Sequence, residues 1–570
     1  MRYLALACDY DGTLATDSKV DERTLEALQR FRASGRRLCL VTGRELDDLK
    51  RVFSPLSLFD RVVAENGALI FNPATGEERL LGAAPPEALL QRLDALGVRP
   101  VSVGRVIVAT WEPHQTAALE AIRECGLEYQ VIFNKGAVML LPSGINKAVG
   151  LKAALDELGL SPHNTVAVGD AENDHALLAA CEVGVAVSNA LPTLKEHADL
   201  VTESPRGAGV VELIDRMLDS DLRELEPKLD RWDIEIGALP DGAKTSVHAY
   251  GRRLLLCGTS GSGKSTFTSG FVERIAAKGY QFCLIDPEGD YAGFADAIVL
   301  GDEQTAPKND DVVDLLKRAG KSVIVNLLAV PLDQRAAAFT TLMARLIETR
   351  AQCGRPHWIV VDEAHHMLPN DLVSVPDALQ YIPTGLLFVT VHPEHVSMQV
   401  LREIDGILLV GETPKETLEA FARSVKRKAP RAEKERVASG EVLFWSIEPA
   451  SDLQRLRTTP ATAERRRHRR KYAAGELDQD RSFYFRGPND SVRLRAQNLA
   501  IFLQIAEGID DETWLHHLRQ HDYSDWLRTA IKNPEIAQAV EQVESAEDPD
   551  PGATREAIRK LIEKTYTLPA

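Results

Sequence analysis

A glycine-rich loop between an apolar run and a predicted helix is the feature that most limits how this chain can fold. Residues 254–257 read Leu-Leu-Leu-Cys, which predicts a short buried strand, and the loop 258–266 that follows has the pattern GxxxxGKST. In such a loop backbone N–H groups surround phosphate oxygens, a lysine bridges the outer phosphates, and a serine hydroxyl coordinates Mg²⁺. We therefore expect a parallel α/β sheet that carries ATP at this loop. The residues expected to hold the nucleotide are Gly258, Gly261, Gly263, Lys264, Ser265 and Thr266, and Ser265 is also an expected Mg²⁺ ligand.

A second strand that ends in two acids supplies the remaining parts of this nucleotide site. Residues 358–361, Trp-Ile-Val-Val, predict a buried strand, and Asp362 and Glu363 follow it. Asp362 is expected to hold Mg²⁺ through water and belongs to the nucleotide-binding set. Glu363 is expected to polarise the attacking water and belongs to the catalytic set. The adjacent acid favours hydrolysis of ATP over phosphoryl transfer to a second substrate.

The length and composition of the chain limit its class. Its 570 residues exceed what one core supports, so about three domains are expected. A net charge of −17 argues against a surface that generally coats nucleic acid, although a local basic groove is compatible with it. The seven scattered cysteines form no CxxC pair, which favours a reducing compartment over a disulfide framework or zinc site. No apolar segment approaches the ~20 residues of a membrane span, so we expect a soluble, cytoplasmic protein that does not contact a membrane.

The N-terminus carries another acidic motif at the end of a strand. The apolar run 3–8 predicts a buried strand, and Asp9-Tyr10-Asp11-Gly12-Thr13-Leu14 follows it. In an open α/β sheet, ligands bind beyond the carboxyl ends of the strands. A carboxylate there attacks a phosphoryl group if a cation neutralises the charge, and a second carboxylate moves protons. On this stretch alone, an acidic turn without catalytic meaning is the alternative reading.

Three further polar positions end or begin predicted elements in the same third of the chain. Thr42 follows the strand 37–41, and Lys147 lies at the start of a helix, where a cation is unfavourable unless an anion is nearby. Asp170 follows the strand 164–168 and opens a second acidic cluster. Two acidic clusters, a threonine and a lysine at element ends are the parts of a Mg²⁺-dependent phosphoryl-transfer site.

The first 217 residues resemble the haloacid dehalogenase-like (HAD) phosphatases. DYDGTL, VTGR, the helix-start lysine and GDAENDHALL are similar to the four motifs of that family in order and spacing. The segment 83–142 resembles the α+β cap of its Cof-type and sucrose-phosphatase-like branch. The resemblance implies that Asp9 is the nucleophile, that Asp11 is general acid and then base, and that Thr42 and Lys147 hold phosphoryl oxygens. It also implies a Mg²⁺ site formed by Asp9, the Asp11 carbonyl group, Asp170, Asn173 and Asp174.

Residues 250–425 resemble the HerA/FtsK-type ATPases. The resemblance is carried by GTSGSGKST, VVDEAHH and the stretch IDPEGDY at 285–291. It implies ATP hydrolysis and a ring assembly in which an arginine of a neighbouring subunit completes the site. Arg345, Arg350 and Arg355 are left open for that role. The sequence departs from the family at His392, where glutamine is usual.

The expected fold class is α/β. A HAD Rossmann-like core with an inserted α+β cap precedes a P-loop NTPase α/β domain and a small C-terminal helical module. The expected boundaries are 1–218 for the phosphatase (core 1–82 and 143–218, cap 83–142), 228–456 for the ATPase, 457–480 for a basic linker, 481–546 for the helical module and 547–570 for a flexible tail with a short helix. We expect the basic linker to be a solvated connector and not a nucleic-acid contact. For His516, His517 and His521, packing or solvent exposure is favoured over metal binding.

These expectations combine into one leading hypothesis. The protein is a Mg²⁺-dependent phosphatase that hydrolyses a small phosphomonoester, such as a sugar phosphate or phosphoglycolate, through an aspartyl-phosphate. It is fused to an ATP-hydrolysing P-loop domain with a regulatory or assembly role. The expected partners are a small phosphorylated metabolite, ATP and further copies of the chain, and nucleic acid is not indicated. The alternatives are a bifunctional kinase–phosphatase and an ATP-switched binding protein whose HAD domain is a scaffold.

Overall fold

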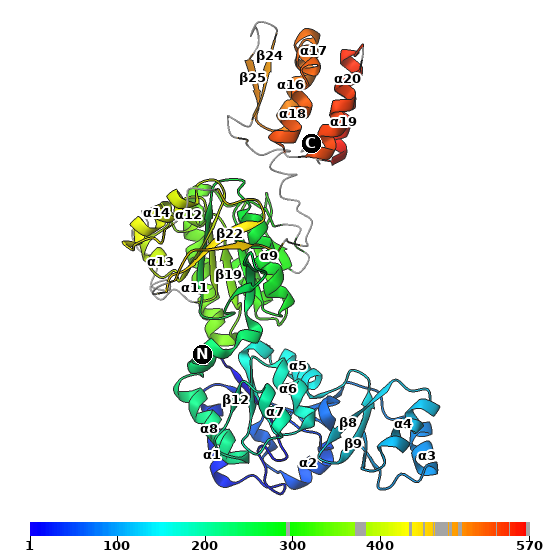
Figure 1. Ribbon diagram of the computed structural model, residues 1–570. Helices are drawn as coiled ribbons and strands as arrows, with labels where there is room; N and C mark the ends of the chain where they lie inside the picture. The colour runs from blue at the N-terminus through cyan, green and yellow to red at the C-terminus, as the bar shows by residue number, and fades with distance from the viewer. Residues whose placement is uncertain are drawn as a thin grey trace. The chain divides into compact units, whose positions relative to one another are not determined.

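Two large parallel sheets and a small helical unit organise the chain in its computed structural model (Figure 1). The described chain divides into two compact units, one formed by residues 1–288 and 296–462 and the other by residues 289–295 and 463–570. No described helix has the length and apolar character that spanning a bilayer requires. The structure describes residues 1–291, 294, 297–370, 384–431, 436–448, 451–459, 461, 477, 482–487, 493–531, 533–546 and 548–565.

The N-terminal part of the first unit is an eight-stranded sheet in the order β12-β11-β10-β1-β2-β3-β4-β5. The strands from β12 to β3 pair in parallel, and β4 and β5 add an antiparallel edge. Strand β1 lies in the middle, fully buried, because each of its residues is apolar until Asp9. The strands are β1 Ala5–Asp9, β2 Arg37–Val41, β3 Arg61–Ala64, β4 Leu69–Phe71, β5 Glu78–Leu80, β10 Thr165–Gly169, β11 Val183–Ala186 and β12 Leu200–Val201.

Helices that connect these strands bury one apolar side each. In the first of them, the Asp21 side chain accepts a hydrogen bond from the Thr24 backbone N–H, which caps the helix, and Leu28 and Phe31 face the core. The helices are α1 Glu22–Ala33, α2 Leu46–Val52, α5 Lys147–Glu157, α6 His175–Ala180, α7 Pro192–His197 and α8 Arg206–Asp219. Together they cover a doubly wound sheet whose strands end at one common edge.

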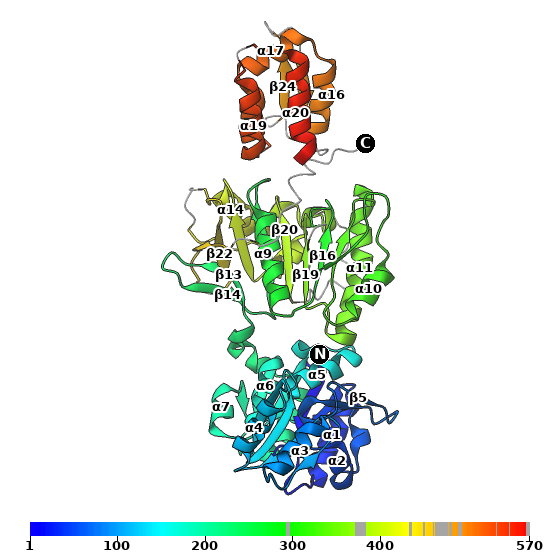
Figure 2. The same cartoon turned by 90° about the vertical axis from the view of Figure 1, so that its right-hand side faces the viewer.

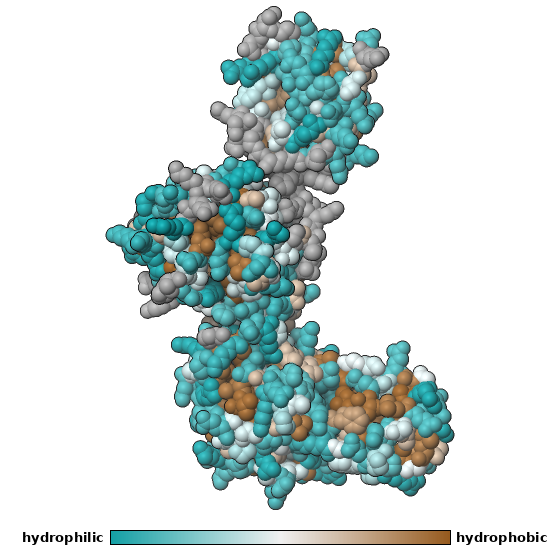
Figure 3. All heavy atoms as spheres, viewed as in Figure 1, coloured by the Kyte–Doolittle hydropathy of each residue, from teal (hydrophilic) through white to brown (hydrophobic). Residues whose placement is uncertain are grey.

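A second, smaller layer is inserted between β5 and α5. Its antiparallel sheet has the order β6-β7-β9-β8, and its two helices pack on it around a separate apolar cluster (Figure 1). Apolar surface covers the strands β8 and β9 in the space-filling view (Figure 3). The elements are α3 Glu87–Ala95, β6 Ser102–Val103, β7 Val108–Trp111, α4 Gln115–Glu124, β8 Tyr129–Asn134 and β9 Ala137–Pro142. We call this layer, residues 83–142, the cap.

The remainder of the first unit contains an eleven-stranded sheet in the order β14-β13-β23-β22-β21-β15-β20-β19-β16-β18-β17. The strands from β21 to β17 pair in parallel, and the other four form an antiparallel extension. Strand β20 lies between β15, which leads into the glycine-rich loop, and β19, which ends at Asp362. The strands are β13 Ile234–Ala238, β14 Lys244–Val247, β15 Arg253–Gly258, β16 Phe282–Asp286, β17 Ala297–Leu300, β18 Ser322–Asn326, β19 Trp358–Val361, β20 Leu386–Thr390, β21 Gly406–Val410, β22 Glu441–Ser446 and β23 Gln454–Arg457.

Helices flank this sheet on both faces, and α9 lies along one of them (Figure 2). Helix α9 begins at Lys264, directly after the glycine-rich loop. The helices are α9 Lys264–Ala277, α10 Asn309–Leu316, α11 Leu332–Cys353, α12 Ala364–Met367, α13 Met398–Arg402 and α14 Pro414–Val425. This arrangement is the expected α/β class with a P-loop at the end of a central strand.

A buried polar cluster joins the two sheets of the first unit. Glu182 is fully buried and accepts hydrogen bonds from the Arg2 guanidinium (2.6 Å), from His163 Nδ1 (2.7 Å) and from the Tyr280 hydroxyl group (2.8 Å). Tyr280 precedes β16, whereas the other three residues belong to the N-terminal part. A fully buried carboxylate is stable only when such partners compensate its desolvation.

In its described residues, the second unit has a β-hairpin and five helices. Its elements are β24 Phe483–Arg486, β25 Arg493–Ala496, α16 Leu499–Gly508, α17 Asp511–Arg519, α18 Asp522–Thr529, α19 Pro534–Glu544 and α20 Pro551–Thr565. The short helix expected within the tail 547–570 corresponds to α20, Pro551–Thr565. Helix α20 packs into the core of the unit, because Ile558 and Ile562 lie one turn apart on its apolar face and are both fully buried. Most of the expected basic linker 457–480 lies outside the described residues.

The three histidines of the second unit do not gather as metal ligands. His517 is buried, its Nε2 accepts a hydrogen bond from the Arg486 backbone N–H (2.8 Å), and its Nδ1 faces an Asp522 carboxylate oxygen (2.6 Å). His521 Nδ1 lies 3.3 Å from Glu544. Among the residues that the structure describes, the one group of acidic, histidine or cysteine side chains with metal-binding geometry lies in the first unit. Packing therefore accounts for His517.

Candidate active sites

The N-terminal acidic motif lies at the carboxyl edge of the first sheet, with Lys147 beside it. Asp9 ends β1, and the Lys147 ammonium group lies 2.6 Å from an Asp9 carboxylate oxygen and 2.6 Å from one of Asp174. All three side chains are buried. Lys147 occupies the first position of α5, behind Asn146, whose side chain caps the helix. The two carboxylates supply the anions that a cation at a helix start requires.

Burial and neighbouring charge set the ionisation of this group. Burial raises the pKa of Asp9 to about 7, the Asp174 carboxylate adds to the rise, and Lys147 opposes it. Burial alone would lower the pKa of Lys147, but the charges of Asp174 and Asp9 outweigh it and hold that pKa above its usual value. Lys147 therefore stays a cation at neutral pH and balances part of the local negative charge.

Three carboxylates in this site lie close enough together to share a divalent cation. One ligand atom each from Asp9, Asp170 and Asp174 lies within 4.8 Å of the others. Asp170 Oδ1 is buried and accepts no hydrogen bond from any residue in the described part of the chain. An orphaned carboxylate oxygen beside two further carboxylates fits Mg²⁺, which prefers oxygen ligands.

The other expected members of the site hold the loop that carries Asp170. Asp174 Oδ2 accepts hydrogen bonds from the backbone N–H groups of Asp170 and Ala171, both at 3.0 Å. The Asn173 side chain donates to Asn66 at 2.9 Å. Asp174 and Asn173 thus fix the position of the loop, which supports the expected role of the acidic cluster.

Thr42 and Asp11 lie at the same edge, and both contact one arginine. Asp9 pairs with Val41 across β1 and β2, so Thr42 follows at the same level of the sheet. The Thr42 hydroxyl group accepts a hydrogen bond from the Arg44 backbone N–H (3.1 Å). The Arg44 guanidinium binds both carboxylate oxygens of Asp11, at 2.6 and 2.7 Å. A bidentate pair of this kind fixes the orientation of the Asp11 side chain.

The structure adds Lys135, which the sequence reasoning did not single out. Its ammonium group lies 2.7 Å from Asp170 Oδ2 and 2.9 Å from the backbone carbonyl oxygen of Asp11. Lys135 and Gly136 form the two-residue turn between β8 and β9, both with positive φ. A lysine before glycine between two apolar runs is a hairpin signal, but the contact with the core depends on the tertiary placement of the cap.

In the second sheet, the glycine-rich loop and the acidic strand end meet at one edge. The Lys264 ammonium group donates hydrogen bonds to the carbonyl oxygens of Gly258 (3.0 Å) and Thr259 (3.1 Å). Ser265 and Thr266 are half-buried in the first turn of α9. Gly261 and Gly263 have φ values of +74° and +101°, which other residues rarely adopt. The loop therefore has the conformation of a phosphate-binding loop.

The acids of the second site lie two strands away from this loop. Asp362 and Glu363 are both buried after β19, and β20 separates them from β15. His365 Nδ1 lies 3.5 Å from Glu363 and 3.1 Å from the Thr390 hydroxyl group. Burial, with the nearby histidines, lowers the pKa of His365 to about 4, so this ring is neutral at pH 7.

Of the three arginines left open for completing a neighbour's site, two are internal. Arg350 donates hydrogen bonds to the carbonyl oxygens of Pro356 and Thr384, at 2.8 and 2.6 Å. Arg355 is fully buried. Arg345 is half-exposed and pairs with Asp310 at 2.9 Å. To reach another subunit, Arg350 would have to leave these carbonyl groups, and Arg355 would have to leave the Lys317 carbonyl oxygen.

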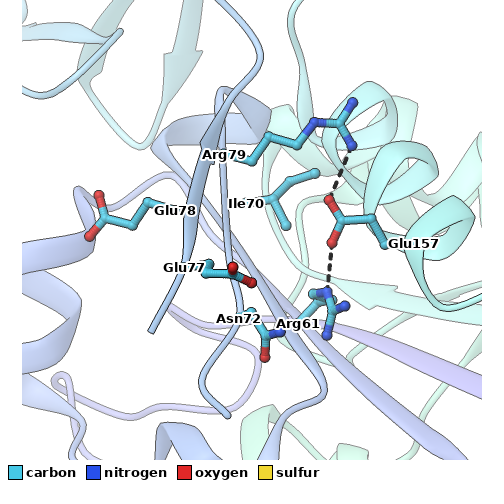
Figure 4. Close-up of a pocket in the computed structure, with 7 residues that line it drawn as sticks. All are labelled: Arg61, Ile70, Asn72, Glu77, Glu78, Arg79 and Glu157. Atoms are coloured by element: carbon cyan, nitrogen blue, oxygen red, sulfur yellow. Dashed lines mark hydrogen bonds and ion pairs between the residues drawn. The ribbon is translucent and has the colours of Figure 1, made fainter. Parts of the chain in front are cut away.

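A surface pocket elsewhere in the first unit holds none of these residues (Figure 4). It lies over β4 and β5, and Arg61 and Arg79 point to opposite oxygens of Glu157 across it, at 2.7 and 3.1 Å. The residues that line it are Arg61, Ile70, Asn72, Glu77, Glu78, Arg79 and Glu157. Both arginines of the pocket are already paired with Glu157, so binding an anion there would require breaking one of these pairs.

Comparison with known proteins decides the family of the first site. The model of the haloacid dehalogenase-like hydrolases matches residues 6–96 and 116–214. A phosphoglycolate phosphatase of Saccharolobus solfataricus is 32% identical over 228 residues, which cover 38% of this chain and 92% of that protein. The chain belongs to the haloacid dehalogenase-like hydrolases. Within this family it is a phosphoric monoester hydrolase, and Asp9, Thr42, Lys147 and Asp170 fall inside the matched ranges.

Other matches extend the comparison. A phosphoglycolate phosphatase of Methanothermobacter thermautotrophicus is 30% identical over 220 residues, which cover 38% of this chain and 98% of that protein. A solved haloacid dehalogenase-like hydrolase of Bacteroides thetaiotaomicron shares 21% identity, with a TM-score of 0.34, and the match covers 38% of this chain and 99% of that one. The model of the HerA helicase central domain matches residues 234–314. This HAD hydrolase therefore carries a HerA-type P-loop domain after its phosphatase part.

Proposed function

We propose that the HAD part is a Mg²⁺-dependent phosphatase that works through an aspartyl-phosphate. The observation that carries the proposal is the buried carboxylate of Asp9, which Lys147 contacts at 2.6 Å beside the unsatisfied oxygen of Asp170. Asp9, Asp170 and the Asp11 carbonyl group would hold Mg²⁺, whose positive charge would offset the repulsion between the nucleophile and a phosphate dianion.

The residues of the chain then perform two successive displacements. An Asp9 oxygen bonds to phosphorus as the ester oxygen leaves, and Asp11 gives that oxygen a proton. Water next attacks the aspartyl-phosphate, Asp11 takes the proton of the water, and inorganic phosphate leaves with Asp9 restored. Lys147 and Thr42 hold the phosphoryl oxygens through both steps. Arg44 fixes the orientation of the Asp11 side chain, because its guanidinium donates hydrogen bonds to both carboxylate oxygens.

The substrate is a small phosphomonoester of the sugar phosphate or phosphoglycolate class. The relatives named as phosphoglycolate phosphatases support this choice, since the matches cover 92% and 98% of those proteins. The protein acts in the cytoplasm, a location that the seven free cysteines favour.

The P-loop part hydrolyses ATP and has a regulatory or assembly role. Lys264 would contact the phosphates and Ser265 would bind Mg²⁺, which Asp362 would hold through water, and Glu363 would polarise the attacking water. Self-assembly places an arginine from a neighbouring copy against the nucleotide. Arg345 is the candidate, because Arg350 and Arg355 are engaged inside the domain.

Phosphatase assays on the full chain test the first proposal. Asp9→Asn is expected to lose hydrolysis of a generic phosphomonoester by at least ~10³-fold, because an amide cannot act as the nucleophile. Asp60→Asn, at an acid away from the site, is the matched control. Unchanged activity in Asp9→Asn would show that the assigned nucleophile is wrong.

A panel of phosphometabolites, assayed with and without ATP in wild type and Lys264→Ala, tests the role of the ATPase. ADP and phosphate are expected to form from ATP without an acceptor, and Lys264→Ala is expected to abolish this reaction. Phosphatase rates that are equal in all four conditions would exclude regulation by ATP. A labelled acceptor would instead establish a kinase.

A further inference from the structure

The ammonium group of Lys135 occupies the place of a cation in the phosphatase site. It contacts Asp170 Oδ2 at 2.7 Å and the Asp11 carbonyl oxygen at 2.9 Å. These two groups are also the ones proposed to bind Mg²⁺. An ammonium cation and a divalent ion compete for these two groups, because like charges a few ångströms apart repel each other.

The core leaves room for this lysine at one glycine. Gly12 has a φ of +85°, and a Cβ atom there would lie 2.6 Å from Lys135 Nζ and 2.3 Å from Asp170 Oδ2. The Asn189 side chain donates to the Gly12 carbonyl oxygen at 2.8 Å, which holds this loop in place. The absence of a side chain at Gly12 thus opens the position in which the ammonium group lies.

Among the described cations that contact the acids of this site, Lys135 is the one that is able to change partners. Lys147 is 1% exposed and lies between two buried carboxylates. Arg44 is bound to both oxygens of Asp11 and to Asp48. The Lys135 side chain, in contrast, is 44% exposed and comes from the tip of a cap hairpin. A long, flexible lysine side chain at such a tip swings away from Asp170 with little strain.

The displaced ammonium group then needs a new anion. The phosphoryl oxygens of the substrate are already assigned to Lys147, Thr42 and the metal. Glu172 accepts a hydrogen bond from the Lys135 backbone N–H (3.3 Å), which keeps the hairpin tip over the site. The ammonium group therefore stays at the acidic edge of the first sheet, and it approaches that edge from the cap.

We propose that Lys135 determines substrate specificity: it competes with Mg²⁺ for Asp170 and the Asp11 carbonyl group, and when the metal is bound it pairs instead with a carboxylate on the leaving group of the substrate. The proposal rests on the proposed phosphatase function. Lys135 then favours phosphomonoesters that carry a carboxylate near the phosphate. The substrate carboxylate replaces the Asp170 carboxylate as the partner of the ammonium group.

Isothermal titration of Mg²⁺ into the full chain, without substrate, tests whether Lys135 competes with the metal. Lys135→Met removes the competing charge and is expected to lower the Mg²⁺ dissociation constant at least ~10-fold, whereas Lys135→Arg, which keeps the charge, stays near wild type. Lys152→Met, at an exposed position of α5, controls for a general change of surface charge. Equal Mg²⁺ affinity in wild type and Lys135→Met would overturn the proposal that this lysine competes with the metal.

Paired substrates at saturating Mg²⁺ test whether Lys135 pairs with a carboxylate of the substrate. 2-Phosphoglycolate and 2-hydroxyethyl phosphate have similar size and differ in the carboxylate. The ratio of their kcat/KM values is expected to fall ~10–100-fold in Lys135→Met and to stay within a few-fold in Lys135→Arg. A ratio that is unchanged in Lys135→Met would overturn the specificity role. Wild type that hydrolyses neither these esters nor a generic phosphomonoester would refute the phosphatase function itself, and the specificity role with it.

Discussion

Replacement of Lys147 by methionine tests how the buried charges of the phosphatase site are balanced. The ammonium group contacts Asp9 and Asp174 at 2.6 Å each, and all three residues are 4% exposed or less. Methionine fills nearly the same volume without the charge, so the main effect is the loss of two charge-assisted hydrogen bonds. It leaves two uncompensated carboxylates in a dry site.

The expected cost follows from that geometry. Removing one partner of a buried ion pair costs about 3–5 kcal/mol, because the remaining charge stays desolvated. For a domain of about 200 residues this corresponds to a fall in midpoint temperature of roughly 6–20 °C. Mg²⁺ brings positive charge to the same carboxylates, so saturating Mg²⁺ is expected to raise the midpoint more in the variant than in wild type.

Differential scanning calorimetry of the full chain measures this effect, with the transition of the HAD part followed separately from the others. Lys152→Met in the same helix is the matched control, since Lys152 is exposed. A Lys147→Met midpoint equal to that of the control would refute the argument that Lys147 balances the buried carboxylates. An equal response of both variants to Mg²⁺ would refute the placement of the metal beside them.

Three further predictions concern other parts of the molecule. Gly12→Ala is expected to abolish Mg²⁺ binding in titration calorimetry, because the Cβ atom would lie 2.3 Å from a carboxylate oxygen of the metal site; Gly35→Ala, with a φ of +88° and no atom within 4 Å, carries a similar backbone cost of about 1–2 kcal/mol and should keep the metal. Burial alone would raise the pKa of Glu182, but the hydrogen bond from His163 and nearby charge lower it. The ionised Glu182 therefore stabilises the folded state above the ordinary glutamate pKa of about 4.3, and this stabilisation is lost as the pH falls through the lowered pKa. The difference in unfolding free energy between wild type and Glu182→Gln should therefore be larger at pH 7 than below about pH 4 in urea titrations, and a pH-independent difference would contradict this. Ile562→Ala is expected to cost about 2–5 kcal/mol in the second unit and to speed amide exchange there, since this side chain is fully buried; unchanged exchange would mean that α20 does not stabilise the unit.

The fold class and most residues of both sites could be predicted from local sequence. Asp9, Thr42 and Asp170 each follow an apolar run, and parallel strands end at one edge of a sheet, so their meeting needs no further information. The loop 258–266 is equally local, because its glycines and its following helix are contiguous. These features require only that the strands belong to one parallel sheet, whatever their order in it.

The remaining features depend on contacts between distant segments. Helix α20 shows this in the second unit: its two buried isoleucines give a weak apolar pattern next to an acidic, proline-containing stretch, and only packing against the other helices makes it part of the core. In the ATPase part, Arg350 and Arg355 bind carbonyl oxygens inside the domain. Their neighbours in the sequence do not distinguish them from an exposed arginine.

The sequence by itself determined the family of the first domain and indicated its phosphoryl-transfer chemistry, because carboxylates, a lysine and glycine-rich turns at strand ends are local patterns. Only the tertiary structure decided which charges face one another. Lys147 lies between Asp9 and Asp174, and Lys135 crosses from the cap to Asp170, over separations of 138, 27 and 35 residues. Electrostatic interactions depend on distance in space and on burial, and neither is written in the neighbouring residues.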